Sequence, residues 1–101
     1  MPEPEGTRPD PPAPLIVIAT NKFQHEMKLL EKRGKRMAKI AAVIEALRTH
    51  QKLHTKYCDH PLIGQWRGWR DCHIEPDWIL IYKRNKGVLT LGRTGRHSDI
   101  F

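Results

Sequence analysis

An apolar run at residues 78–82 constrains the fold of this chain more strongly than any other segment. The run Trp78-Ile79-Leu80-Ile81-Tyr82 lies between Glu75-Pro76-Asp77 and the segment 84–87. Both flanking segments carry residues that favour turns, namely proline and aspartate in the first and glycine in the second. An uninterrupted apolar run between two turns is typical of a central strand, so we expect residues 78–82 to lie in the middle of a sheet.

Strands on either side of this run are predicted to complete an antiparallel sheet. Residues 66–74 alternate, so that Trp69, Asp71 and His73 share one face while the residues between them share the other. This phase places Asp71 and His73 side by side on one surface. After the turn at 84–87, residues 88–93 are predicted to form the final strand.

The N-terminal half of the fold is predicted to be one short strand and two amphipathic helices. The run 15–19 is apolar and rich in β-branched residues, and we expect a strand buried on both faces. Thr20 or Asn21 can cap the helix that follows. Two apolar stripes at helical spacing flank a turn at Gly34, and we interpret their side chains as core: Phe23, Met27 and Leu30, then Met37, Ile40, Ala41, Ile44 and Leu47.

Together these elements predict an α+β fold with the order β-α-α-β-β-β, in which two N-terminal helices pack on a mostly antiparallel sheet. The segment 53–64 keeps no periodicity and is expected to be a loop that carries His60. A chain of 101 residues makes one domain, which we place at residues 15–101. Residues 1–14 hold six of the eight prolines, and we expect them to be a disordered leader outside the fold.

The sequence offers no segment suited to a membrane span or a secretion signal. No stretch approaches the roughly 20 apolar residues of a transmembrane helix. The N-terminus lacks a basic start followed by an apolar run. We therefore expect a cytoplasmic protein in which Cys58 and Cys72 are reduced thiols.

The positive charge of the chain is concentrated in the predicted helices. Residues 15–56 carry a net charge of +7, against −2 for residues 1–14 and +2 for residues 57–101. A basic surface attracts a polyanion or an acidic protein through long-range, salt-sensitive electrostatics. An ordinary solvated helical face is the alternative interpretation.

Three histidines in the C-terminal part of the chain carry most of the chemical information. His60, His73 and His97 each lie in a polar turn or strand, with aspartates and an arginine nearby in sequence. RNA cleavage without a metal needs a base for the ribose 2′-OH, an acid for the leaving 5′ oxygen and a cation for the phosphate oxygens. Histidine can fill the first two roles because it changes charge near neutral pH.

Arg93 and several aromatic side chains fit the remaining needs of RNA cleavage. A guanidinium stays charged and its fork of donors matches phosphate oxygens, so Arg93 suits the third role. Trp69, Trp78 and Phe101 can stack on unpaired bases, which is how proteins usually hold single-stranded RNA. Trp78 lies in the apolar run, however, and is also consistent with a core position.

Other interpretations of these residues stay open at the level of the sequence. A single histidine is more often a surface or structural residue than a catalyst. Three histidines with Asp71 or Asp77 could bind zinc, but no tight spacing such as His-x-x-x-His or Cys-x-x-Cys is present. A nucleophilic cysteine beside a histidine is unspecific, and the predicted strand phase puts Cys72 on the face opposite His73.

Two segments carry a denser signal than any single residue. They are residues 59–82, with the sequence DHPLIGQWRGWRDCHIEPDWILIY, and residues 93–101, with the sequence RTGRHSDIF. Both closely resemble the YafQ toxins, a branch of the RelE/ParE superfamily of bacterial type II toxin–antitoxin systems. Residues 15–58 are similar to the same family mostly in pattern.

The resemblance implies a RelE-like fold and a ribosome-dependent endoribonuclease that cuts mRNA in the ribosomal A site and stops translation. Members of the family use no metal, so neither a metal nor another cofactor is expected. A DinJ-like antitoxin is implied as the partner that silences the toxin. Contact with ribosomal RNA and mRNA is expected to be direct, contact with operator DNA is expected only through the antitoxin, and no membrane is involved.

The family's functional positions fall on residues already singled out. We assign His60 and His73 to the proton transfers and His97 to the leaving group. Asp77 is expected to orient or share that work. The resemblance implies substrate binding by Asp71, Arg93 and Phe101, with the phosphate contact assigned to the arginine. Trp78 is added to this set because of its predicted stacking on bases.

Two other classes of function remain as hypotheses. A ParE-like toxin of the same fold would inhibit a protein such as a topoisomerase, and fold alone cannot separate it from an endoribonuclease. A plain RNA-binding module would use its histidines only for stacking or phosphate contact. A protein inhibitor has no need of three histidines, two aspartates and an arginine that converge, so we favour the endoribonuclease.

Overall fold

A computed structural model describes residues 12–101, so most of the predicted leader at 1–14 lies outside the described residues. Two short 3-10 helices, η1 (Thr55–Tyr57) and η2 (Gly64–Trp66), flank β2. The strands and α-helices follow the chain as β1 (Ile16–Ala19), α1 (Asn21–Lys32), α2 (Met37–Arg48), β2 (His60–Pro61), β3 (Arg70–Glu75), β4 (Trp78–Asn85), β5 (Val88–Gly95) and α3 (His97–Ile100).

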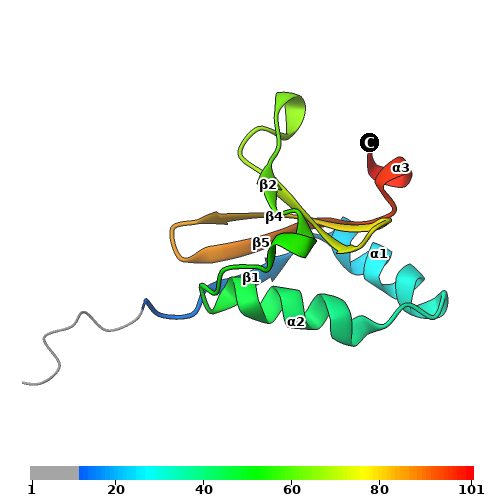
Figure 1. The fold of residues 1–101 in the computed structure, drawn as a ribbon, viewed down its shortest axis with the longest axis horizontal. Coiled ribbons are helices and arrows are strands. Elements are labelled where there is room, and N and C mark those ends of the chain that lie inside the picture. Colours follow the sequence, from blue (N-terminus) through cyan, green and yellow to red (C-terminus); the bar gives the residue numbers. More distant parts are fainter. Residues whose placement is uncertain (1–11) are drawn as a thin grey trace, which may run out of the picture.

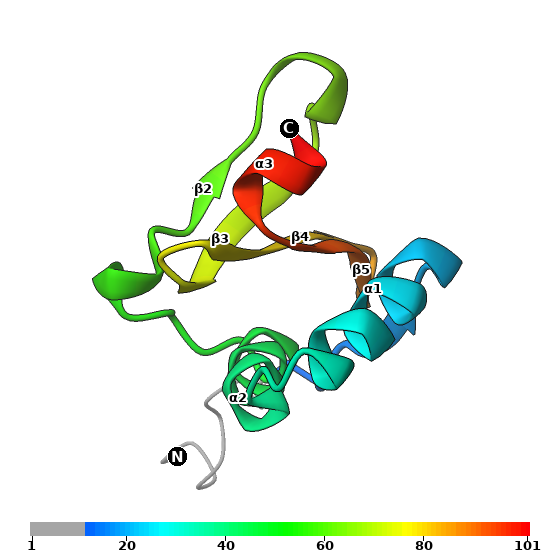
Figure 2. The same cartoon turned by 90° about the vertical axis from the view of Figure 1, so that its right-hand side faces the viewer.

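The five strands form one sheet in the order β1-β5-β4-β3-β2. β1 pairs in parallel with β5, and all other neighbours are antiparallel. Helices α1 and α2 lie on one side of the sheet, whereas α3 and the segment between β2 and β3 lie on the other (Figure 1, Figure 2). The predicted α+β fold, with two N-terminal helices on a mostly antiparallel sheet, is confirmed. The short elements β2 and α3 were not predicted.

The main core lies between the sheet and the two long helices. Phe23 and Leu30 of α1 are buried, as are Ile40, Val43 and Leu47 of α2. Burial of side chains of this size stabilises the fold by roughly 1.5–3 kcal/mol each. They pack against strand side chains that point toward the helices: Cys72, Ile74, Trp78, Leu80, Tyr82, Leu89 and Leu91.

Strand β1 lies at the edge of the sheet, so the prediction that it is buried on both faces is wrong. Ile16, Val17 and Ile18 keep 67%, 38% and 51% of their surface exposed. A short apolar run favours a strand, but only the pairing of the whole sheet decides whether that strand is central or at the edge. The second helical stripe also needs one correction, because Ala41 is exposed whereas Val43 is buried.

The β4–β5 hairpin closes through two residues with left-handed backbone. Lys86 and Gly87 have φ angles of 49° and 79°. Positive φ at both central positions defines the type I′ turn, whose twist matches that of the flanking strands. The tight turn lets β4 extend to Asn85, beyond the predicted end of the strand at residue 82.

Candidate active site on the open face of the sheet

The register of the sheet brings several predicted site residues into one row. His60 of β2 pairs with Asp71 of β3, Asp71 pairs with Ile81 of β4, and Ile81 pairs with Arg93 of β5. Residues that pair directly across strands point to the same face. This face lies opposite the helices, because the neighbouring side chains of β3 and β4 belong to the helix-covered core. His73 pairs with Ile79 and belongs to the same face.

The ring of His60 is oriented by the backbone of its own loop. Its Nδ1 lies 2.7 Å from the carbonyl oxygen of Cys58. Because a carbonyl only accepts hydrogen bonds, Nδ1 carries the hydrogen in this contact. In the neutral ring, Nε2 then keeps a lone pair that can accept a proton. The His60 side chain is about half exposed, so this nitrogen is accessible to a substrate.

Asp71 lies beside His60 and on the same face of the sheet as His73. The residue is only 2% exposed, and its Oδ1 lies 3.1 Å from Nδ1 of His60. Burial raises the pKa of Asp71, while positive charge on His60, His73 and His97 acts in the opposite direction. His60 and Asp71 lie in different segments of the sequence, and the pairing of β2 with β3 brings them together.

The other two histidines belong to different elements of the fold. Nδ1 of His73 lies 3.1 Å from the carbonyl oxygen of Pro76 in the β3–β4 turn, which fixes the hydrogen on Nδ1 as it does in His60. His97 begins α3, and its ring centroid lies 4.9 Å from that of Phe101. Helix α3 thus carries both C-terminal site residues over the open face of the sheet (Figure 2).

Asp77 occupies the β3–β4 turn and is exposed. Its charge contributes to raising the pKa of Arg96, although the main cause is the pair that Arg96 forms with Asp99 inside α3. No direct contact between Asp77 and a site histidine is found among residues 12–101. Its predicted role beside the proton transfers stays a prediction.

An aromatic cluster that the sequence only partly revealed lines the open face. The ring centroid of Trp66 lies 5.8 Å from that of Trp69 and 6.3 Å from that of Phe101. The ammonium group of Lys83 lies 4.5 Å from the ring centroid of Trp69. The strand alternation placed Trp69 on this face correctly, whereas nothing in the sequence pattern singled out Lys83 as its neighbour. Phe101 is 48% exposed and available for stacking.

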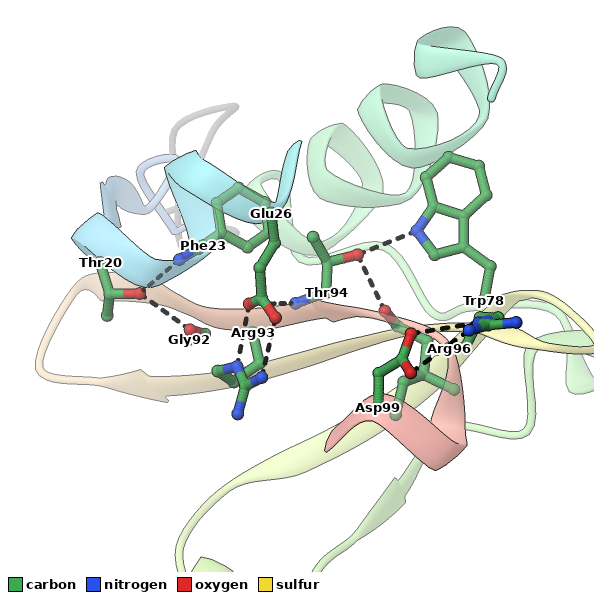
Figure 3. Close-up of polar contacts among 10 residues, drawn as sticks. Thr20, Phe23, Glu26, Trp78, Gly92, Arg93, Thr94, Arg96 and Asp99 are labelled. Carbon is green, nitrogen blue, oxygen red and sulfur yellow. Dashed lines mark hydrogen bonds and ion pairs between the residues drawn. The ribbon is translucent and has the colours of Figure 1, made fainter. Parts of the chain in front are cut away.

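Trp78 belongs to the core, so its predicted role in substrate binding is wrong. The residue is 1% exposed and packs on the helix side of the sheet. Its indole N–H donates to the hydroxyl oxygen of Thr94 at 2.9 Å, and that hydroxyl donates to the carbonyl of Ile79 (Figure 3). A base cannot stack on a ring that is enclosed in this way. The apolar run 78–82 already pointed to this outcome.

A partly buried polar network that sequence reasoning missed anchors the loop before β2. Asp59 Oδ1 accepts hydrogen bonds from the Tyr82 hydroxyl at 2.6 Å and from Arg70 Nε at 3.2 Å. Burial and the bond to Asp59 both raise the pKa of Tyr82, so its hydroxyl stays protonated and donates. The network ties the residue next to His60 to the core of the sheet, and it thereby fixes the position of that histidine.

A groove of about 1020 Å³ adjoins the site on the helix side. His73 and Cys58 contribute to its wall next to the site. The rest of the wall is formed mostly by α2, η1 and the end of β3. It combines basic and apolar side chains with one acidic residue, Glu75, and its members are Arg36, Met37, Ala38, Lys39, Ala42, Lys56, Tyr57, Ile74, Glu75 and Pro76.

Within residues 12–101, no three or more His, Cys, Asp or Glu side chains are grouped so that they could hold a metal ion. Within the same range, none of the helices is long and apolar enough to cross a membrane.

Comparison with known proteins identifies close relatives. A family model for the bacterial toxin of type II toxin–antitoxin systems, YafQ, matches residues 16–101. The mRNA interferase toxin YafQ of Escherichia coli strain K12 is 42% identical over 83 residues, which cover 81% of this chain and 90% of that protein.

Solved structures agree with this match. The E. coli DinJ–YafQ toxin–antitoxin complex contains a chain that is 41% identical, with a TM-score of 0.79 over 84% of this chain and 94% of that one. A metal-bound toxin from Helicobacter pylori is 37% identical, with a TM-score of 0.82 over 86% of this chain and 99% of that one. The fold is therefore that of bacterial toxins. Among these toxins, the chain belongs to the YafQ family of type II toxin–antitoxin systems.

Proposed function

We propose that the chain is an mRNA interferase: a ribosome-dependent, metal-independent endoribonuclease that cleaves mRNA in the ribosomal A site and thereby inhibits translation. The E. coli relative bears the name of an mRNA interferase toxin, and its identity to this chain extends over most of both proteins. The observation that carries the proposal is the pair formed by His60 and the buried Asp71, 3.1 Å apart, with His73 on the same face of the sheet. Such a group can hold and exchange protons beside a phosphodiester.

His60 is the strongest candidate for the general base. Its Nδ1 is occupied by the Cys58 carbonyl, so that Nε2 is free to take the proton of the ribose 2′-OH. The resulting 2′ oxygen attacks the adjacent phosphorus, the bond to the 5′ oxygen breaks, and an acid protonates that leaving oxygen. The neighbouring Asp71 stabilises the imidazolium that forms on His60, because opposite charges at this distance favour the charged ring.

The remaining histidines have complementary roles in the proposal. His73 shares the proton transfers from β3, and His97 on α3 lies near the leaving group. Asp77 orients this group or shares its work from the β3–β4 turn. Arg93 on β5 contacts the phosphate, since its guanidinium keeps a positive charge in every protonation state of the histidines.

The aromatic cluster is proposed to hold the bases that flank the cut. Phe101 is the most exposed ring of the group and has Trp66 as an edge-to-face neighbour. A ring supported from one side by another aromatic offers its free surface to an unpaired base. Of the predicted substrate-binding residues, Arg93 and Phe101 thus remain on the substrate side of the proposal, whereas Trp78 lies in the core and the buried Asp71 acts through His60.

The basic N-terminal half is proposed to dock on the ribosome. Residues 15–56 carry the net charge of +7, and they form β1, the two long helices and η1 up to Lys56. Helices with this charge attract ribosomal RNA through the phosphate backbone. The E. coli relative forms a complex with DinJ, so we propose a DinJ-like antitoxin as the silencing partner. Operator DNA is reached only through that antitoxin, and the toxin acts in the bacterial cytoplasm.

Primer extension in a cell-free translation reaction tests the proposal. We expect discrete in-frame cuts in a reporter mRNA that require ribosomes and persist in EDTA. The reaction with EDTA tests whether cleavage needs a metal ion, because a related toxin is metal-bound. Cuts should disappear with His73→Ala and His97→Ala and remain with His50→Ala, whose ring contacts only the Ala13 carbonyl within the described chain. Arrest of translation without any cut would instead favour a ParE-like inhibitor of a protein target.

A further inference from the structure

The open edge of β5 is the place where the site-bearing face of the sheet meets α1. β1 pairs with β5 only as far as Ala19 and Leu91, whereas β4 continues to pair with β5 up to Gly95. The outer edge of β5 beyond Leu91 therefore has no strand beside it. Backbone groups along such an edge need other hydrogen-bond partners.

Helix α1 and its cap supply these partners (Figure 3). The Thr20 hydroxyl donates to the carbonyl oxygen of Gly92 at 2.8 Å and accepts from the backbone N–H of Phe23 at 3.0 Å. Further along the edge, Glu26 Oε1 accepts from the backbone N–H of Thr94 at 3.3 Å. The carboxylate of Glu26 is thereby held against the open edge of β5.

The same carboxylate binds Arg93 through two hydrogen bonds. Oε1 and Oε2 of Glu26 accept from Nε and Nη2 of Arg93 at 2.9 and 2.8 Å. Each of the two side chains keeps only 15% of its surface exposed. A two-point contact of this kind fixes the plane of the guanidinium, which a single contact would leave free to rotate.

The pair leaves one edge of the guanidinium free. Of the five N–H groups of an arginine, the Glu26 carboxylate takes one on Nε and one on Nη2. Within residues 12–101, no other side chain or carbonyl accepts a hydrogen bond from Arg93. Both N–H groups on Nη1 and the second one on Nη2 can therefore bind an external anion.

The free edge lies on the face that carries the candidate site. Arg93 is opposite Ile81, and Ile81 is opposite Asp71, so the side chains of Arg93 and Asp71 emerge on the same side of the sheet. Figure 3 shows the guanidinium on the side of the sheet away from α1, with Glu26 reaching past β5 to meet it.

We propose that Glu26 is a positioning residue for the proposed cleavage: it holds Arg93 so that the free edge of the guanidinium faces the scissile phosphate. This inference rests on the proposed function. Glu26 itself touches no reacting atom. Without it, Arg93 keeps its charge and still attracts RNA, but its donors are no longer aimed at the phosphate in the transition state. The rate of the cleavage step should therefore fall, whereas the affinity for the substrate should not change.

Steady-state cleavage on ribosomes programmed with mRNA tests this split between kcat and KM. We expect Glu26→Gln to lower kcat by about 10- to 100-fold and to leave KM unchanged or lower. Glu26→Asp keeps the carboxylate and should recover part of the loss. The matched control is Glu45→Gln, which breaks the two-point contact of Glu45 with Arg48 on α2 and should leave kcat at the wild-type value.

A double-substitution cycle separates positioning from a structural role. If Glu26 acts through Arg93, then Glu26→Gln should cause no further loss of kcat in an Arg93→Ala background. Additive losses would overturn the inference, as would a wild-type kcat in Glu26→Gln or a rise in KM without a fall in kcat. Should Glu26→Gln fail to fold, Glu26→Asp gives the same KM and kcat comparison. Absence of cleavage by the wild type would overturn the proposed function itself.

Discussion

Oδ1 of the buried Asp71 lies 3.1 Å from Nδ1 of His60, yet this oxygen accepts no hydrogen bond from any residue in the described part of the chain. The hydrogen on Nδ1 is directed to the Cys58 carbonyl, 2.7 Å away. A buried carboxylate oxygen without a donor destabilises the fold. The Asp71 carboxylate lies directly beside the His60 ring, so it can stabilise a positive charge that develops on that ring during proton transfer.

We predict that Asp71→Asn costs activity without costing stability. A folded-state pKa above the ordinary 3.8 means that Asp71 contributes stability at low pH that is lost as the pH rises through the raised value. The asparagine of Asp71→Asn does not titrate, so the variant does not lose this stability. The melting temperature of the variant minus that of wild type should therefore increase as the pH rises from about 4. Cleavage should fall by about 100-fold or more. A variant that is less stable than wild type at pH 8 would contradict this view of Asp71.

Glu75 is expected to stabilise the fold only above its lowered pKa. Its carboxylate accepts from Lys35 at 2.8 Å and from Lys39 at 2.7 Å, and these bonds lower its pKa from 4.5 to about 2. The stabilisation is therefore complete above pH 4.5 and is lost as the pH falls toward 2. Melting curves of wild type and Glu75→Gln should differ modestly at pH 7 and converge near pH 2. A difference that is independent of pH would exclude this ion-pair origin.

Trp78→Phe should act on stability and not on RNA. The substitution removes the hydrogen bond from the indole to Thr94 and leaves space in the core, which together cost about 1–3 kcal/mol. Urea unfolding measures this cost, and binding of a short single-stranded RNA serves as the second readout. Trp66→Phe at the partly exposed cluster is the control and should change stability little. Loss of RNA affinity in Trp78→Phe at unchanged stability would restore the stacking role.

Gly92→Ala should displace the Trp69 ring. A β-carbon at this position would lie 2.4 Å from the nearest carbon of that ring, so either the ring or the strand must move. We expect a loss of about 1–3 kcal/mol in the free energy of unfolding. In a Trp69→Ala background the same substitution should cost much less, because the obstructing atoms are gone. Equal costs in both backgrounds would show that backbone strain, not the ring, is responsible.

The C-terminal half of the fold could be predicted because its signals are local. Alternation along residues 69–73 put Asp71 and His73 on one face, and turn residues marked both hairpins. The edge position of β1 could not be predicted, since its apolar run resembles that of a central strand. Elements as short as β2, with two residues, have too little periodicity to be recognised.

The contacts that organise the site are mostly long-range, and the sequence pattern does not reveal them. Glu26 and Arg93 are 67 positions apart, and Asp59 and Tyr82 are 23 apart. Glu26, Arg93 and Asp59 are each consistent with an exposed polar position when taken alone, and the apolar run that contains Tyr82 does not reveal its polar partner. Only the pairing of strands and the path of α1 across the edge of β5 bring the partners together. The predicted site histidines, by contrast, could be chosen from their polar settings in the sequence and from the family resemblance.

The most direct test of acid–base cleavage by histidine is the single-turnover rate of mRNA cleavage on ribosomes between about pH 5.5 and 8.5, measured for wild type and His60→Ala. We predict that the wild-type rate varies with pH around neutrality. His60→Ala should lower the rate by about 10²- to 10⁴-fold. The rise of the rate with pH that comes from deprotonation of the general base should be absent in this variant. A wild-type rate that is flat over this range, or an unchanged profile in His60→Ala, would contradict the account.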